Sequence, residues 1–183
     1  MAAPAAAPVF VVRGTIEVDR PEDIQFEQDG VKVYADPEIG LYLTCVGDPP
    51  VGNSASVANK LDVAKLHARG LTGSRVAVAI VDTGINIAHL KMKGLSPKID
   101  KNVTIAPPGV AATPGSYPVD HGTMCAFDAL IAAPKATLID IPTLLSTTPG
   151  GSAMSGFLSD ALRAFSFLLT RFTSPAWKYR ALV

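Results

Sequence analysis

The sequence predicts an α/β fold in which helices flank a parallel sheet. Two apolar runs, residues 75–81 and 136–141, are rich in Val, Ile and Leu and have the length of strands buried on both faces. Segments with helical periodicity lie before and after them, and this alternation is typical of parallel sheets. The composition fits a sheet covered on both faces, because 48% of the 183 residues are hydrophobic and only 17% are charged.

Charge and hydropathy argue against several classes of function. The 16 basic and 16 acidic residues give a formal net charge of zero, so we expect no nucleic-acid surface and no polybasic membrane anchor. No apolar run approaches the ~20 residues that span a bilayer. The N-terminus lacks the pattern of a secretory signal, so we expect a cytoplasmic protein or a secreted one whose signal is not part of these residues.

The cysteines and carboxylates suggest no bound group. Two cysteines, Cys45 and Cys125, are too few for a disulfide framework, and each is interpreted as a small buried apolar residue. No EF-hand loop and no zinc-binding pattern is present. We therefore predict neither a cofactor nor a metal site.

The N-terminal portion differs in composition from the rest. Residues 1–8 are rich in alanine and proline and are expected to form a flexible tail. Residues 9–45 are predicted to form a small α+β module, with strands at 9–13 and 30–35 and a helix or turn that begins at 21–23. Residues 46–57 contain the glycine, proline, asparagine and serine that are typical of a linker.

Residues 58–183 are predicted to form the main domain, with strands and helices in alternation. The expected elements are helix 58–68 with Gly70 as its C-cap, strand 75–81, a loop-rich insertion at 91–118, helix 121–132, strand 136–141, helix 156–172 with Ser155 as its N-cap, and strand 180–183. This order implies right-handed crossovers. The sequence ends inside the last apolar run, so the sheet is predicted to be incomplete at its C-terminal end.

Asp82 and His121 are the candidate catalytic residues. Asp82 follows the apolar run 76–81, and functional groups gather at the carboxyl ends of strands in an open parallel sheet. His121 begins the next predicted helix, which can bring it beside Asp82. The aspartate would accept the imidazole Nδ1–H, and the second ring nitrogen would then be free to take a proton from a serine hydroxyl. Taken singly, a turn aspartate and an exposed helix-start histidine would be equally ordinary.

Several motifs, in the correct order, resemble those of the subtilisin-like serine proteases, or subtilases. They are the helix and glycine turn at 66–73, Asp-Thr-Gly-Ile at 82–85 followed by His89, Asp-His-Gly-Thr at 120–123, Cys125 at the position of a free cysteine in proteinase K-like members, and Ala-Pro-Lys-Ala-Thr-Leu at 133–138. The resemblance implies a subtilisin-like fold, with Asp82 as the triad aspartate, His121 as the general base and a structural role for His89. Residues 31–39 resemble the closing segment of a propeptide-type module.

The nucleophile that the resemblance implies is missing. The family serine lies in Gly-Thr-Ser-Met-Ala-x-Pro, after an oxyanion-hole asparagine, and neither element occurs here. Ser152 and Ser155 follow His121 too closely, lack the proline and are rejected as nucleophiles. Gly150, Gly151 and Ser152 instead resemble the edge at which substrate adds as an extended strand, although an ordinary glycine loop explains them equally well.

The sequence therefore predicts a serine endopeptidase of the subtilisin type that is inactive as this chain alone. Its expected partners are a peptide or protein substrate and the remaining C-terminal part of the catalytic domain, in the same or a second chain. The alternative is a non-catalytic truncated subtilase half that binds peptides or a partner. An aspartic protease also uses Asp-Thr-Gly, but its fold is all-β and is disfavoured by the predicted helices.

Overall fold

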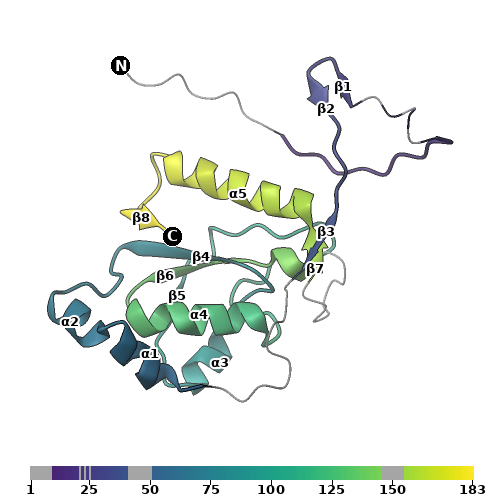
Figure 1. Cartoon of the computed structure of the whole chain (residues 1–183). Helices are drawn as coiled ribbons and strands as arrows, with labels where there is room; N and C mark the ends of the chain where they lie inside the picture. Colours follow the sequence, from purple (N-terminus) through teal and green to yellow (C-terminus); the bar gives the residue numbers. More distant parts are fainter. Residues whose placement is uncertain (1–9, 21, 23, 25, 41–50, 146–154) are drawn as a thin grey trace.

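The computed structural model describes residues 10–20, 22, 24, 26–40, 51–145 and 155–183. A four-stranded parallel sheet lies at its centre with helices on both faces, so the predicted α/β class is confirmed (Figure 1). The strand order is β5 (Lys98–Ile99), β6 (Thr137–Ile141), β4 (Val76–Val81) and β8 (Ala181–Leu182). One face carries α1 (Ser54–Lys60), α2 (Val63–Ala68), α3 (Ile87–Met92) and α4 (His121–Ala132), and the other carries α5 (Leu158–Thr173).

Both faces of the sheet are apolar because each is covered. The cluster under α3 and α4 consists of Ile80, Ile85, Leu90, Ala126, Leu130 and Leu138. The cluster under α5 consists of Ala77, Ile139, Ile141, Ala164 and Leu168. Alternate residues of β4 and β6 thus enter two different cores, which explains why both strands are largely apolar, with the buried Asp140 of β6 as an exception.

The positions of the helices fix the relative hand of the crossovers. The chain moves from β4 past β6 to β5 with α3 on one face and returns to β6 with α4 on the same face. It then moves from β6 past β4 to β8 with α5 on the opposite face. The first and third crossovers therefore share one hand, and β5–α4–β6 has the other. Since almost all such crossovers are right-handed, β5–α4–β6 is the left-handed exception to the prediction.

The N-terminal residues form two small strand pairs. β1 (Glu27–Gln28) and β2 (Val31–Lys32) form a hairpin whose two-residue turn, Asp29-Gly30, has the positive φ angles of 52° and 79° that such turns require. β3 (Glu38–Gly40) pairs antiparallel with β7 (Ser155–Phe157). The predicted strand 30–35 is thus shorter than expected, and residues 10–13 of the predicted strand 9–13 form no strand. The tail 1–8 and Cys45 lie outside the described residues.

The helical segment before β4 departs from the prediction at its start and in its middle. α1 begins at Ser54, inside the predicted linker 46–57, because Asn53 and Ser56 form a capping box. The expected helix 58–68 is divided between α1 and α2, since Asp62 adopts a left-handed φ of 53°. The predicted C-cap is confirmed: Gly70 has φ 76°, and Leu71 N–H donates to Leu66 O as in a Schellman motif.

The start of α5 also differs from the prediction. Ser155 belongs to β7, so its assignment as the N-cap is wrong, and Phe157 at that position makes no side-chain cap. A distant carboxylate takes this role: Asp36 accepts Ser159 N–H and Ser159 Oγ–H, both at 2.7 Å. Within the part of the chain that the structure describes, no helix is long and apolar enough to cross a bilayer.

Candidate active site

Asp82 lies where the two central strands of the sheet end. Its backbone N–H donates to Ile141 O at 3.0 Å, and its carbonyl accepts Leu144 N–H at 2.9 Å. The helices that follow β4 and β6 cover opposite faces of the sheet, and a crevice opens at such a point in α/β folds. The Asp82 side chain is only 10% exposed, and Thr83 N–H donates to its Oδ1 at 2.7 Å.

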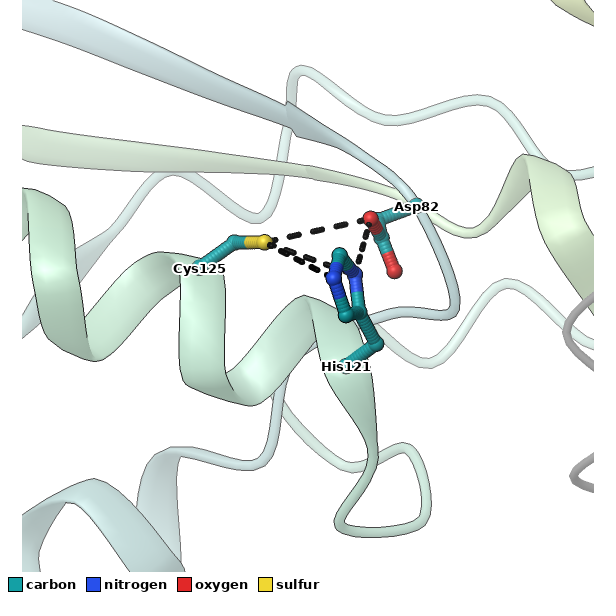
Figure 2. Close-up of side chains that lie close together, drawn as sticks. All are labelled: Asp82, His121 and Cys125. Atoms are coloured by element: carbon teal, nitrogen blue, oxygen red, sulfur yellow. Dashed lines mark hydrogen bonds and ion pairs between the residues drawn. The ribbon is translucent and has the colours of Figure 1, made fainter. Parts of the chain in front are cut away.

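His121 is the first residue of α4, and its side chain points toward Asp82. The carboxylate of Asp120 caps the helix by accepting His121 N–H at 2.8 Å, which fixes the position of His121 at the start of α4. His121 Nδ1 lies 2.8 Å from Asp82 Oδ2 (Figure 2). The structure thus brings together the two residues that the sequence selected, in the orientation expected. With Nδ1–H donated to the carboxylate, Nε2 carries the free lone pair of a general base.

Hydrogen bonds between threonine side chains and the backbone join the aspartate motif to the histidine motif. Thr83 Oγ1 accepts Gly122 N–H at 2.9 Å, and Thr123 Oγ1 accepts Asn86 N–H at 3.0 Å. The backbones of the two motifs also approach each other closely. A Cβ on Gly122 would lie 2.5 Å from Gly84 O, nearer than real Cβ atoms approach. The threonines and glycines beside Asp82 and His121 are therefore the residues that hold the pair in register.

The turn after Asp82 is held by a second set of contacts that the sequence did not reveal. Asn86 donates from Nδ2 to Tyr117 O at 2.7 Å and accepts His89 N–H at 2.9 Å. Gly84 has φ 91°, and a Cβ there would lie 2.4 Å from the Tyr117 ring. Tyr117 comes from the insertion 91–118, which sequence reasoning treated only as loop. Aromatic and asparagine residues in loops carry no periodic signal that would have identified these contacts.

Cys125 lies one helical turn after His121 and touches the same pair. Its Sγ is 3.4 Å from His121 Nδ1 and 4.0 Å from Asp82 Oδ2. Burial, followed by the negative charges of Asp82 and Asp128, raises the pKa of the Cys125 thiol above its ordinary value. The thiol is therefore neutral near pH 7 and is a poor nucleophile.

Asp82, His121 and Cys125 are also the described residues that could together hold a metal ion, since their ligand atoms lie within 4.8 Å of one another. A metal ion there would have to displace the thiol proton and the Nδ1 proton. It would also replace the hydrogen bond by which Asp82 orients the imidazole ring. The arrangement therefore suits proton transfer better than metal binding.

The other two histidines belong to α2 and α3. His67 is half-buried and its Nε2 lies 2.9 Å from Ala132 O, so it joins α2 to the end of α4. His89 lies in α3. Gly150, Gly151 and Ser152 lie outside the described residues, and β7 begins three residues after Ser152.

An extended segment of the chain is bound along β7. In this antiparallel pairing Glu38, Ile39 and Gly40 lie opposite Phe157, Gly156 and Ser155. Pro37 O accepts Leu158 N–H at 3.0 Å, next to the cap that Asp36 provides. A short stretch of backbone can therefore bind this edge by strand addition.

A second contact ties the N-terminal residues to α5. Arg13 forms an ion pair with Asp160 at 2.6 Å, and its guanidinium lies 4.4 Å from the centre of the Phe157 ring. The Asp160 side chain is only 2% exposed, and Arg163 is its second partner at 3.2 Å.

Comparison with known proteins adds nothing to this geometry, since no family model and no curated protein matches the chain.

Proposed function

We propose that this chain supplies the aspartate and the histidine of a serine endopeptidase of the subtilisin type. The observation that carries the proposal is the 2.8 Å contact of Asp82 Oδ2 with His121 Nδ1 at the carboxyl edge of a parallel sheet. The hydrogen bonds of Thr83 and Thr123 support it, because each links the aspartate motif to the histidine motif. These bonds account for the threonine in both motifs, which a coincidental pair would not need.

The proposed roles follow from the two ring nitrogens. Asp82 accepts Nδ1–H, which fixes the neutral tautomer of His121 and stabilises the imidazolium that forms when the ring takes a proton. His121 Nε2 then removes the proton of a serine hydroxyl as that oxygen attacks the peptide carbonyl. In the next stage His121 returns the proton to the leaving amine.

The nucleophile is proposed to come from outside these 183 residues. Ser155 pairs with Gly40 in the β3–β7 ladder, and its position in a strand does not suit an exposed nucleophile on a tight turn. A serine and an oxyanion-hole donor supplied by the same or a second chain would complete the unit. Loss of one oxyanion donor alone typically costs ~10²–10³ in rate, so this chain by itself should be inactive.

The substrate is proposed to be an extended peptide that adds to the edge of β7, residues 155–157. The supporting observation is that β3 binds β7 in this manner. Gly150, Gly151 and Ser152 would extend the same edge, where the absence of bulky side chains lets a substrate backbone approach. A free peptide would then have to displace the residues of β3 from β7 or bind to β7 before they do.

Fluorophosphonate labelling followed by intact-mass measurement tests the proposal. The 183-residue chain alone should take no adduct, whereas the chain combined with a polypeptide that supplies the Gly-Thr-Ser-Met-Ala-x-Pro segment and the oxyanion-hole asparagine should take one, on a serine of that polypeptide. His121→Ala should abolish the adduct, and His89→Ala should leave it as the matched control. No adduct in the combined protein would contradict the proposal. An adduct on Ser152 or Ser155 of the chain alone would place the nucleophile in this chain.

The second candidate is a non-catalytic module that binds peptides or a partner, and the β3–β7 pairing favours it as well. The two functions differ in what they require of His121. A binding module should retain a peptide on the β7 edge after His121→Ala and should never release cleaved products. A protease should lose all turnover with this substitution while peptide binding persists.

A further inference from the structure

Asp140 is a buried carboxyl that neither motif contains. It is the penultimate residue of β6, it lies opposite Ile80 of β4, and its residue exposure is 0%. Its Oδ2 accepts Gly115 N–H at 2.8 Å and Ile85 N–H at 3.2 Å. Its Oδ1 is buried and has no hydrogen-bond partner among the described residues.

The two N–H groups belong to the loops that frame the catalytic pair. Ile85 is three residues after Asp82, in the turn whose Gly84 contacts Gly122. Gly115 makes a second contact with this region, because its carbonyl oxygen accepts Ile87 N–H at 2.9 Å. One carboxyl oxygen therefore ties the turn after β4 to the insertion that carries Tyr117.

We propose that Asp140 is a positioning residue for the Asp82–His121 pair, and that it clamps the two loops as a neutral carboxylic acid and releases them when it ionises. Leaving Oδ1 without a partner costs less free energy for a neutral carboxyl group than for a carboxylate. The carboxylate would be a buried charge with hydrogen bonds to only one of its two oxygens. Opening the loops would let water reach Oδ1. The inference rests on the proposed function only in naming the pair catalytic.

The surroundings place this change near neutral pH. Burial raises the pKa of Asp140 to about 7, against the weaker lowering effect of the Gly115 and Ile85 N–H groups, and no charged side chain contributes. The titratable side chain that responds to Asp140 is Tyr117, whose pKa is raised first by burial and then by the negative charge of Asp140. The remaining titratable groups on this side are Asp82, which follows β4, and His121, Cys125 and Asp128 of α4.

Hydrogen exchange of the full 183-residue chain tests the clamp. Protection factors of the Ile85 and Gly115 amides, which correct for the intrinsic pH dependence of exchange, would be compared at pH 5.5 and 8.5. For the natural chain we expect protection to fall by up to roughly thirtyfold at the higher pH, because proton linkage favours the open loops there. The amides of Ala164 and Leu168, on the far face of the sheet, serve as internal controls.

Two variants separate positioning from mere packing. Asp140→Asn keeps an acceptor oxygen without the charge, so both amides should remain protected at both pH values. Asp140→Leu removes the acceptor, so both should be exposed at both pH values. The NMR signal of the His121 Nδ1 proton should follow the same pattern, persisting in the Asn variant at pH 8.5 and weakening in the natural chain.

Two results would overturn the clamp: unchanged protection of the natural chain between the two pH values, or loss of protection in Asp140→Asn at pH 5.5. These measurements need no substrate and no serine. If the pH dependence of amide protection is absent but fluorophosphonate labels a serine, the clamp is wrong and the proposed function stands. If the pH dependence is present but no serine is labelled, only the proposed function is contradicted.

Discussion

At the scale of single residues, Asp82 decides which nitrogen of His121 is free. Asp82→Asn would offer an amide N–H as readily as a carbonyl oxygen, and the ring would turn its protonated nitrogen toward the proposed serine. In the complete protease that we propose, we expect kcat to fall by ~10⁴ with little change in stability. Asp128→Asn removes the same charge from the exposed side of α4 and serves as the control. Equal losses in the two variants would argue against this role of Asp82.

Gly122 tests the contact between the motifs. Its missing side chain lets α4 approach the turn after β4, and a Cβ would meet the rigid backbone oxygen of Gly84 at 2.5 Å. We expect Gly122→Ala to lower the free energy of unfolding by about 1–3 kcal/mol, as overpacking typically does. Denaturant unfolding measures this, and Gly14→Ala, which has open space around it, should change stability far less.

At the scale of elements, residues with a local signal were predictable and residues with distant partners were not. Helix 121–132 and the strands β4 and β6 agree with the prediction because Asp120 caps the helix and the two strands consist mainly of apolar residues. The prediction of Ser155 as the N-cap was wrong although a serine before an apolar helix is a normal cap. The carboxylate that caps the helix is that of Asp36, 123 residues away from Ser159 in sequence. The contact of Asp82 with His121 followed from two motifs, but the clamp of Asp140 depends on loop positions that no pattern encodes.

The cap from Asp36 gives a prediction about α5. Asp36→Ala would remove both bonds to Ser159 and leave the start of the helix without its carboxylate. We expect a loss of about 1–2 kcal/mol and faster exchange of the Leu158 and Ser159 amides. Cleavage of the N-terminal segment by an added protease should also become faster. The exposed Asp19→Ala is the control, and identical behaviour of the two variants would contradict the capping role.

At the scale of the whole molecule, α5 presents an apolar stripe that no described residue fully covers. Its members recur every three or four residues and are all exposed: Leu158, Leu162, Phe165, Leu169 and Phe172. The edge of β8 is also open, since β8 pairs only with β4 in the described sheet. Exposed strand edges and apolar stripes of this size promote association.

Adjacent leucines of α5 separate association from folding. Leu169 is 63% exposed and Leu168 only 5%. We expect Leu169→Ser to reduce concentration-dependent association in sedimentation experiments and to leave the unfolding midpoint almost unchanged. Leu168→Ser should instead destabilise the fold by about 2–5 kcal/mol, because it opens a cavity and buries a hydroxyl. Unchanged association of the Leu169 variant would show that the stripe is not the contact surface.

The stability of the whole chain should depend on pH through Asp140. Its pKa is near the ordinary 3.8 when unfolded and about 7 when folded, so the folded state holds a proton that the unfolded state loses. Stability is therefore greatest below pH ~4 with respect to this group and declines as the pH rises to ~7, by at most about 4 kcal/mol. Relative to the natural chain, Asp140→Asn should gain stability across this interval. Parallel curves for the two proteins would contradict the shift.

The position of β6 determines when the sheet can form during synthesis. β6 lies between β5 and β4, yet it is the last of the three to be made. Neither earlier strand has a partner in this sheet until residues 137–141 enter the space between them, so a nascent chain ending before Ile141 holds two separated, unpaired strands. The pairing of β6 with β4 joins residues far apart in the sequence, such as Ala77 and Thr137, which makes it a non-local and slow event. A pause in translation just before β6 would thus prolong an open, aggregation-prone intermediate.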